Sequence, residues 1–157
     1  MKATFSKDIL NFILYFLLVI LILCTIGAPI AFIVQLVNAP SISSLINMIT
    51  NLIYTSMYLI VVICLIRIIS STLVSPFIHE NVKRFRIMGY CLMVNTVFEC
   101  IDRYSSAATS GMTIIGSDRG GITPLMLICL LSALMCFVMG EIFDKAIKIK
   151  NESDLTI

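Results

Sequence analysis

The sequence lacks charge over a very long stretch near its beginning. Of 157 residues, only 13% are Asp, Glu, Lys or Arg, while 59% are hydrophobic. No charged residue and no histidine occurs between Asp8 and Arg67. Soluble domains average about 25% charged residues, so this composition excludes an ordinary soluble domain. Because about 20 apolar residues cross the hydrocarbon core of a bilayer, the uncharged stretch is long enough for two membrane-spanning helices.

Residue types that support catalysis or metal binding are also missing or scattered. His79 is the only histidine, so a His-Glu-x-x-His zinc motif is excluded. No Gly-rich phosphate loop is present, and no two cysteines form a Cys-x-x-Cys pair. The sequence therefore predicts a protein that is not an enzyme and that holds no metal and no cofactor. We expect the cysteines to be small buried packing residues: Cys24, Cys64, Cys91, Cys100, Cys129 and Cys136.

Four apolar segments predict an all-α fold, an integral membrane four-helix bundle formed as a single domain over residues 1–157. The first apolar run is longer than the core of a signal peptide, so we expect a retained span. The connections are short, which favours antiparallel packing of sequence neighbours. The predicted spans cover residues 12–37, 45–69, 87–104 and 123–140.

The connecting segments carry turn and cap signals. After Pro76 the chain can restart as a short helix that leads into the third span. Residues 105–121 are rich in Ser, Thr and Gly, and we expect a loop there. Thr123 followed by Pro124 has the pattern of an N-cap and a first helical position. Helical spacing then continues past the fourth span and predicts a cytoplasmic helical tail over 141–150, with Glu141 and Lys145 spaced for an ion pair.

The distribution of basic residues predicts the orientation. Nine of the 11 Lys and Arg residues lie before the first span, at the end of the second span (Arg67), between the second and third spans, or in the tail. Only Arg103 and Arg119 lie on the other side. Basic residues favour the cytoplasmic face, so both termini and the middle segment are predicted to be cytoplasmic. The expected location is the cell membrane, as a multi-pass protein of the bacterial inner membrane.

The third predicted span carries polar residues within its body, which are functional candidates by default in a membrane. Asn95, Glu99 and Asp102 follow i, i+4, i+7 spacing and share one face, and Arg103 follows Glu99 at the spacing of an ion pair. The second span has a similar stripe. Our hypothesis is that the two stripes face each other across an outward-facing polar pocket. The alternative is that they are interfacial helix ends, with Glu99 and Arg103 neutralising each other. The stripe on the second span comprises Asn47, Asn51, Tyr54 and Tyr58.

Two short motifs resemble a known family. One is Pro76-Phe77 followed by Glu-Asn-Val-Lys-Arg over residues 80–84, and the other is the tail Glu-Ser-Asp-Leu-Thr-Ile over residues 152–157. Together they resemble a family of small bacterial four-span membrane proteins classed as domain of unknown function 2975 (YoaS-like). Ser153 stands where the family usually has Asn. The resemblance implies an uncharacterised function and a cytoplasmic partner, a helix-turn-helix transcription regulator, and it implies no catalytic or ligand-binding residue.

The two motifs also have a physical interpretation. Both lie at the predicted cytoplasmic face, where they can form a docking surface for a soluble partner. The alternative is a clasp that closes the inner face of the bundle. In the clasp, Glu80, Asn81 and Asp154 cap neighbouring helix ends, and the basic residues Lys83, Arg84 and Arg86 face anionic lipid headgroups. The candidate docking residues are Glu80, Asn81, Lys83, Arg84, Glu152 and Asp154.

Three functions stay open at this point. The first is a non-enzymatic membrane sensor or regulator that controls the cytoplasmic regulator. The second is an immunity protein against a membrane-active peptide, and the third is a small transporter or channel subunit that uses Glu99. The expected partners are the lipid bilayer and the helix-turn-helix regulator. Self-association into a homo-oligomer stays open, and no direct nucleic acid binding is expected.

Overall fold

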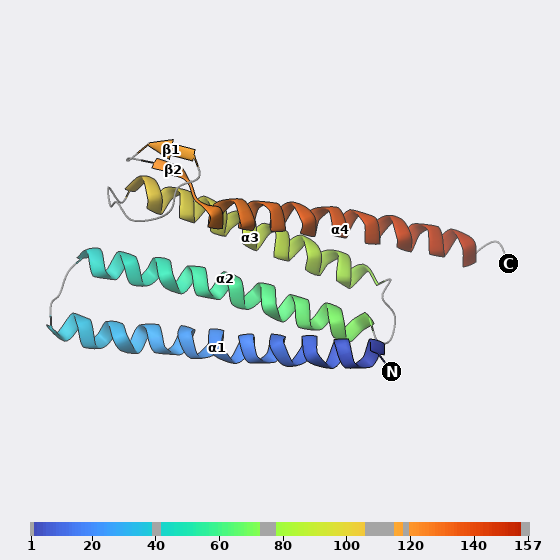
Figure 1. The fold of residues 1–157 in the computed structure, drawn as a ribbon, viewed down its shortest axis with the longest axis horizontal. Coiled ribbons are helices and arrows are strands. Elements are labelled where there is room, and N and C mark those ends of the chain that lie inside the picture. The colour runs from blue at the N-terminus through green and yellow to red at the C-terminus, as the bar shows by residue number, and fades with distance from the viewer. Residues whose placement is uncertain (1, 39–41, 73–77, 106–114, 118–119, 155–157) are drawn as a thin grey trace. The chain divides into compact units, whose positions relative to one another are not determined.

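The computed structural model describes residues 2–38, 42–72, 78–105, 115–117 and 120–154 of the chain. Within these residues the chain forms four helices and one small hairpin (Figure 1). The fold is therefore all-helical apart from the hairpin, as the apolar segments predict. In chain order, the elements are α1 (Lys2–Asn38), α2 (Ile42–Thr72), α3 (His79–Ser105), β1 (Ile115–Ser117), β2 (Gly120–Ile122) and α4 (Pro124–Asp154).

The chain divides into two compact units, Met1–Ser70 and Ser71–Ile157. The first unit contains α1 and nearly all of α2, and these two helices run antiparallel (Figure 1). The second unit contains α3, the hairpin and α4, and here α3 and α4 run antiparallel as well (Figure 1). The single membrane domain stays a prediction.

The helices of the first unit present apolar side chains on almost every side. Among the described side chains of α1, Leu14 is buried, whereas Phe12, Phe16 and Leu23 each expose more than half of their surface. The helix passes through Pro29 without interruption. A helix that is hydrophobic all round is expected in a membrane or in the core of a large protein. The surface of α1 thus fits a lipid environment.

Hydroxyl side chains in these apolar helices bond back to their own backbone. The hydroxyl of Thr25 donates to the carbonyl of Ile22 at 2.8 Å, and that of Thr55 donates to the carbonyl of Asn51 at 2.8 Å. In hydrocarbon a hydroxyl without a partner is costly, and this local bond removes that cost. The same pattern recurs at Thr50, Ser56, Ser70 and, in α3, Thr96.

Three helices in the described part of the chain are long and apolar enough to cross a membrane: Asp8–Ile30, Met48–Ser71 and Pro124–Ser153. These helices are consistent with a membrane protein and fall on three of the four predicted spans. The third predicted span, within α3, is not among them, because Asn95, Glu99 and the basic residues near its start lower the hydropathy. The fourth crossing and the orientation of the termini stay predictions.

In the second unit, α3 and α4 pack closely along their lengths. A Cβ atom added to Gly89 would lie 2.8 Å from Cε1 of Phe137, so the Phe137 ring occupies the space that a side chain would need. Tyr90 contacts the same ring edge-on with centroids 5.1 Å apart, and Phe85 and Phe143 lie 5.3 Å apart. Small residues allow such close approach of membrane helices. On α4 the buried small residues are Cys129, Ala133 and Gly140.

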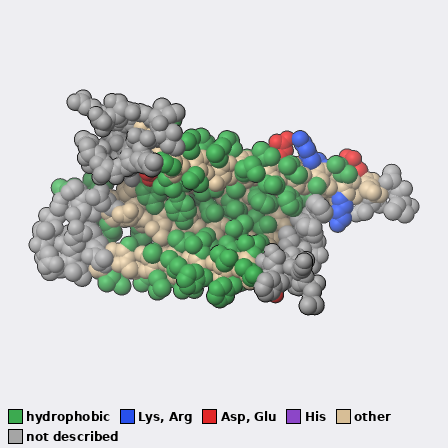
Figure 2. Space-filling view, in the orientation of Figure 1, with side chains coloured by type: hydrophobic (Ala, Val, Ile, Leu, Met, Phe, Trp, Pro, Cys, Tyr) green, Lys and Arg blue, Asp and Glu red, His purple; other side chains and the backbone are tan. Residues whose placement is uncertain are grey.

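The start of α4 confirms the predicted cap. The backbone N–H of Met126 donates to Oγ1 of Thr123 at 3.1 Å, and α4 begins at Pro124. The helix then continues without a break to Asp154, beyond the predicted end of the tail. Figure 2 shows hydrophobic side chains over much of the visible part of α4, with charged side chains gathered mainly toward its C-terminal part.

The prediction of a loop over residues 105–121 is wrong in part. Strands β1 and β2 pair antiparallel, with Ile115 opposite Ile122 and Ser117 opposite Gly120, and β2 contacts α3. Strands of three residues that contain Gly and Ser show no alternation of apolar and polar residues, so the pattern gave no strand signal. The predicted restart before the third span is confirmed, because α3 already begins at His79. Residues 75–77 of the first motif lie outside the described residues.

Candidate functional site

The inner face of α3 is unusual because it carries polar residues. Positions 81, 88, 92, 95 and 99 recur at spacings of seven, four, three and four, and so lie on one side of the helix. In a soluble helix the buried side would be apolar and the exposed side polar. Here Asn81, Met88, Leu92 and Asn95 are buried and Glu99 is half-buried. The exposed large side chains of α3 are Ile87, Tyr90, Met93, Val94, Val97 and Ile101.

Asn95 is the central feature of this face. Its side chain is 1% exposed, and neither Nδ2 nor Oδ1 has a hydrogen-bond partner among the described residues. Leaving a buried amide unsatisfied costs about 1–3 kcal/mol per group. Counted from the contact between Gly89 and Phe137, Asn95 lies level with the stretch of α4 that contains the buried Cys129 and Ala133.

Glu99 lies one helical turn beyond Asn95 on the same face and is half-buried. Together the two side chains offer one amide donor, one amide acceptor and a carboxylate within a single turn of an otherwise apolar region. Such a pair can hold water or a proton, or accept a polar ligand. The side chains of Asp102 and Arg103 lie outside the described residues, so the predicted ion pair between Glu99 and Arg103 stays a prediction.

The predicted partner stripe belongs to the first unit. Asn51 is exposed on α2, and its carbonyl accepts the hydroxyl of Thr55 at 2.8 Å. Tyr54, one turn from Asn51, is half-buried. The side chain of Asn47 is not among the described ones. The facing of this stripe toward α3 stays a prediction.

At the other end of α3, Asn81 is fully buried and holds the helix start. Its Oδ1 accepts the hydroxyl of Ser71 and Nη1 of Arg84, each at 2.8 Å. Its backbone N–H donates to the carbonyl of Ile78 at 2.9 Å. A guanidinium donor strengthens this cluster, because hydrogen bonds to charged groups are worth more than neutral ones. The first turn of α3 is thereby fixed to Ser71.

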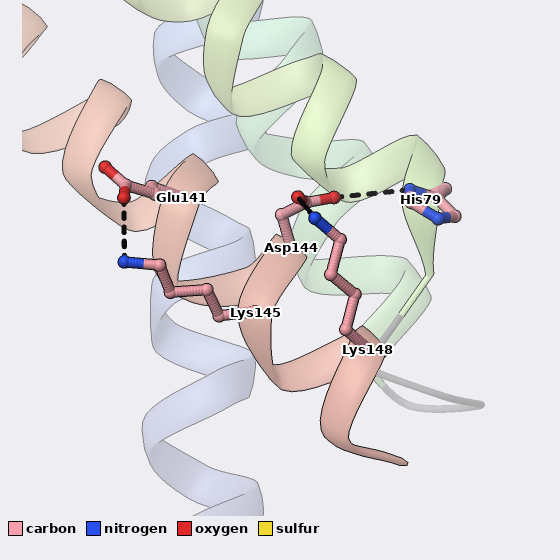
Figure 3. Close-up of polar contacts among 5 residues, drawn as sticks. All are labelled: His79, Glu141, Asp144, Lys145 and Lys148. Atoms are coloured by element: carbon pink, nitrogen blue, oxygen red, sulfur yellow. Dashed lines mark ion pairs between the residues drawn. The ribbon is translucent and has the colours of Figure 1, made fainter. Parts of the chain in front are cut away.

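Charged residues of α4 lie at the same end of the unit as the start of α3 (Figure 3). Asp144 Oδ2 lies 3.1 Å from Nζ of Lys148, and its Oδ1 lies 3.7 Å from Nδ1 of His79 at the start of α3. The predicted pair of Glu141 and Lys145 is confirmed at 2.8 Å. The side chain of Asp144 is only 22% exposed, whereas that of Glu141 is 68% exposed. Asp144 therefore connects α3 with α4, whereas the pair of Glu141 and Lys145 lies on the surface of α4 alone.

The structure separates the predicted docking residues into two groups. Glu80, Lys83 and Glu152 are exposed. Asn81 and Arg84 instead bond to each other at the helix start, so Arg84 does not point outward as the clasp interpretation expects. The choice between a clasp and a docking surface stays open. The side chain of Asp154 and all of residues 155–157 lie outside the described residues.

Sequence reasoning did not find the contact between His79 and Asp144, nor the seat of Phe137 on Gly89. Both are cross-helix contacts that depend on how α3 and α4 pair. The one available signal was the spacing of Asp144 and Lys148, four residues apart in the same order as Glu141 and Lys145.

None of the six cysteines forms a disulfide. Cys64, Cys91 and Cys129 are buried as expected, whereas the expectation is wrong for Cys24, which is exposed on α1. Among the described residues, no group of three His, Cys, Asp or Glu side chains could hold a metal ion.

A family model described as "Protein of unknown function (DUF2975)" matches residues 7–157, nearly the whole chain. The chain belongs to this family. The predicted membership in DUF2975 is thereby confirmed, while the four spans stay a prediction. No curated protein and no solved structure matches this DUF2975 chain. The family description assigns no activity.

Proposed function

We propose that this chain is a non-enzymatic integral membrane protein with four spans that senses a change near Asn95 and Glu99 and relays it to a cytoplasmic regulator. The observation that carries the proposal is Asn95, a buried amide without a described hydrogen-bond partner on the inner face of α3. An apolar residue of similar size at this position would avoid the free-energy cost of an unsatisfied buried amide. Buried polar groups in membrane helices are therefore functional candidates.

The membrane placement of α3 is supported by its reversed polarity. Its outer face from Ile87 to Ile101 is apolar and exposed, while Asn95 and Glu99 point to the packed side. Water would favour the opposite arrangement, whereas lipid favours this one. At 27 residues, α3 is also long enough to cross a bilayer.

Topology reporters test this placement directly. Fusions after Ser44 and Ser110 should report the extracytoplasmic side, and fusions after His79 and Asn151 should report the cytoplasm. A Ser110 fusion on the same side as the His79 fusion would contradict the fourth span.

The relay is supported by the continuity of α3 and α4. Asn95 and Asn81 lie on the same face of α3, so a shift of that face reaches the Ser71–Asn81–Arg84 cluster. Asp144 and Phe143 bind the same end of α3 to α4. The exposed charges of α4 beyond that point can contact a soluble protein.

The test uses the full chain with Asn95→Leu. We expect the variant to insert and accumulate normally. The amount of helix-turn-helix regulator that co-purifies with it from native membranes should change at least several-fold. Deleting residues 151–157 should abolish co-purification without affecting insertion. Asn11→Leu is the matched control, because it removes an amide from α1, outside the two polar stripes, and should leave the regulator bound. If Asn95→Leu leaves both the binding and the phenotype unchanged, the sensing role is wrong.

A small transporter or channel subunit is the second candidate, favoured by the placement of a carboxylate one turn from a buried amide. Purified chain in liposomes should then support ion or proton flux that Glu99→Gln abolishes. The regulator hypothesis predicts no such flux.

A further inference from the structure

The outer face of α3 changes character along its length. Lys83 and Arg86, one turn apart, are exposed near the helix start, and the exposed Tyr90 follows one turn later. Val94 and Val97 then continue the same face as exposed apolar residues. A sequence of basic, aromatic and apolar side chains on one face is the pattern of a helix that passes from headgroups into hydrocarbon.

The two basic residues are not neutralised by the ion pairs of this unit. Asp144 is paired with Lys148 and His79, and Glu141 with Lys145. Arg86 interacts with Asp144 only at longer range, and no ion pair joins Lys83 or Arg86 to a carboxylate among the described residues.

The neighbouring Arg84 has a different role. It donates to the buried Asn81 and so belongs to the packed side of α3. Of the three basic residues over 83–86, two therefore face outward and one holds the helix start. Glu80 is the nearest exposed carboxylate in the sequence, three residues before Lys83.

Tyr90 is held in place although its surface is 63% exposed. Its ring contacts Phe137 edge-on, and Phe137 is itself fixed against Gly89. Long side chains on a helix lean toward its N-terminus. The phenol of Tyr90 therefore leans toward the turn of Lys83 and Arg86, and those two side chains lean toward the water.

We propose that Lys83, Arg86 and Tyr90 form a binding site for the headgroup of an anionic phospholipid. The phosphate would lie between the ammonium and guanidinium groups, with the phenol as a further hydrogen-bond donor. The acyl chains would run along Val94 and Val97. The proposal rests on the membrane placement of α3 given above, and it does not depend on the regulatory role.

The absence of tryptophan from the chain permits a direct test. Val94→Trp places a single fluorophore beside the proposed acyl chains and leaves the three headgroup residues intact. The full chain is reconstituted in phosphatidylcholine vesicles containing about one tenth brominated lipid, either phosphatidylglycerol or phosphatidylcholine, because bromine quenches tryptophan on contact. Leu131→Trp is the matched control, since Leu131 is exposed on α4 at the level of Val94, counted from the contact between Gly89 and Phe137.

Each basic residue near a membrane surface favours anionic lipid by roughly five-fold. We therefore expect brominated phosphatidylglycerol to quench Val94→Trp with at least about three-fold higher efficiency than brominated phosphatidylcholine, and to quench Leu131→Trp equally with both lipids. Adding Lys83→Gln and Arg86→Gln should remove the preference, and Lys83→Arg with Arg86→Lys should retain it. Lys145→Gln with Lys150→Gln removes two charges from the same end of the unit and should leave the preference intact.

Three results would overturn the site. One is equal quenching of Val94→Trp by both lipids, and another is a preference that survives Lys83→Gln with Arg86→Gln. The third is quenching of Leu131→Trp but not of Val94→Trp, which would show that protein, such as a second copy of the chain, covers this face. Failure of the regulator co-purification with a preserved lipid preference would instead reject only the proposed regulatory function.

Discussion

In the first unit, α1 and α2 expose apolar side chains, and hydroxyls such as those of Thr25 and Thr55 are satisfied within their own helix. The second unit places Asn81 and Asn95 on the packed side of α3. The first arrangement is what insertion into lipid alone requires. The second adds polar groups that insertion does not require and that packing does not favour. The comparison supports the proposed site in the second unit, and the following changes can break or sharpen it.

The largest effect is expected where the second unit is most tightly packed. Gly89→Leu forces a side chain into the space of the Phe137 ring and should lower the free energy of unfolding by about 1–3 kcal/mol. Gly27→Leu is the control in the first unit, because nothing lies within 4 Å of a Cβ added there. Unfolding in mixed detergent with rising dodecyl sulfate, followed by circular dichroism, measures both. Equal losses in the two variants would mean that the units are packed alike.

Asn95→Leu should act in the opposite direction. Leucine has the same branching as asparagine and no unsatisfied polar atoms, so we expect the free energy of unfolding to rise by about 1–3 kcal/mol. Asn51→Leu, at an exposed position of α2, should change it little. The same detergent titration measures both variants. A less stable Asn95→Leu protein would show that the amide is hydrogen-bonded in the membrane, and the contrast between the units would weaken.

Removing a hydroxyl should lower the free energy of unfolding more at the N-cap of α4 than within the helices of the first unit. Thr123→Ala leaves the Met126 N–H without its acceptor and should cost about 1 kcal/mol. Thr55→Ala removes only a bond to the preceding turn of α2 and should be nearly neutral. Paired unfolding titrations decide this, and a loss at Thr55 that matches the loss at Thr123 would contradict the expectation.

The smallest effects concern the charged end of α4. Asp144→Asn should destabilise the unit more than Glu141→Gln, because Asp144 joins two helices while Glu141 pairs within one. Surface pairs within one helix contribute little. The difference should shrink at high salt, which screens exposed charges. If Glu141→Gln is the more harmful change in the same titration, the cross-helix role of Asp144 is wrong.

The parts of the fold that follow local rules were predictable from the sequence. Unbroken apolar runs gave three helices that can span a membrane, and Thr123-Pro124 gave the start of α4. The hairpin was missed because its strands are short and rich in glycine. The residues of the candidate site could be predicted, because Asn95 and Glu99 interrupt an apolar helix. That Asn81 is buried could not be predicted, because an Asn that follows a Glu in a basic segment looks like a surface residue until Ser71 and Arg84 are placed around it.

Because α4 is unbroken from Pro124 to Asp154, it can tilt as one rigid rod. Phe137, seated in the notch at Gly89, lies near the middle and can serve as the pivot. From Phe137 to Asp154 the arm measures about 26 Å at a rise of ~1.5 Å per residue. A tilt of roughly 10° about the pivot would move the tip by about 4 Å, the width of a side-chain contact. The same tilt would move α4 by only about 1.6 Å at the level of Asn95, so under the proposed relay the arm would enlarge that displacement roughly three-fold.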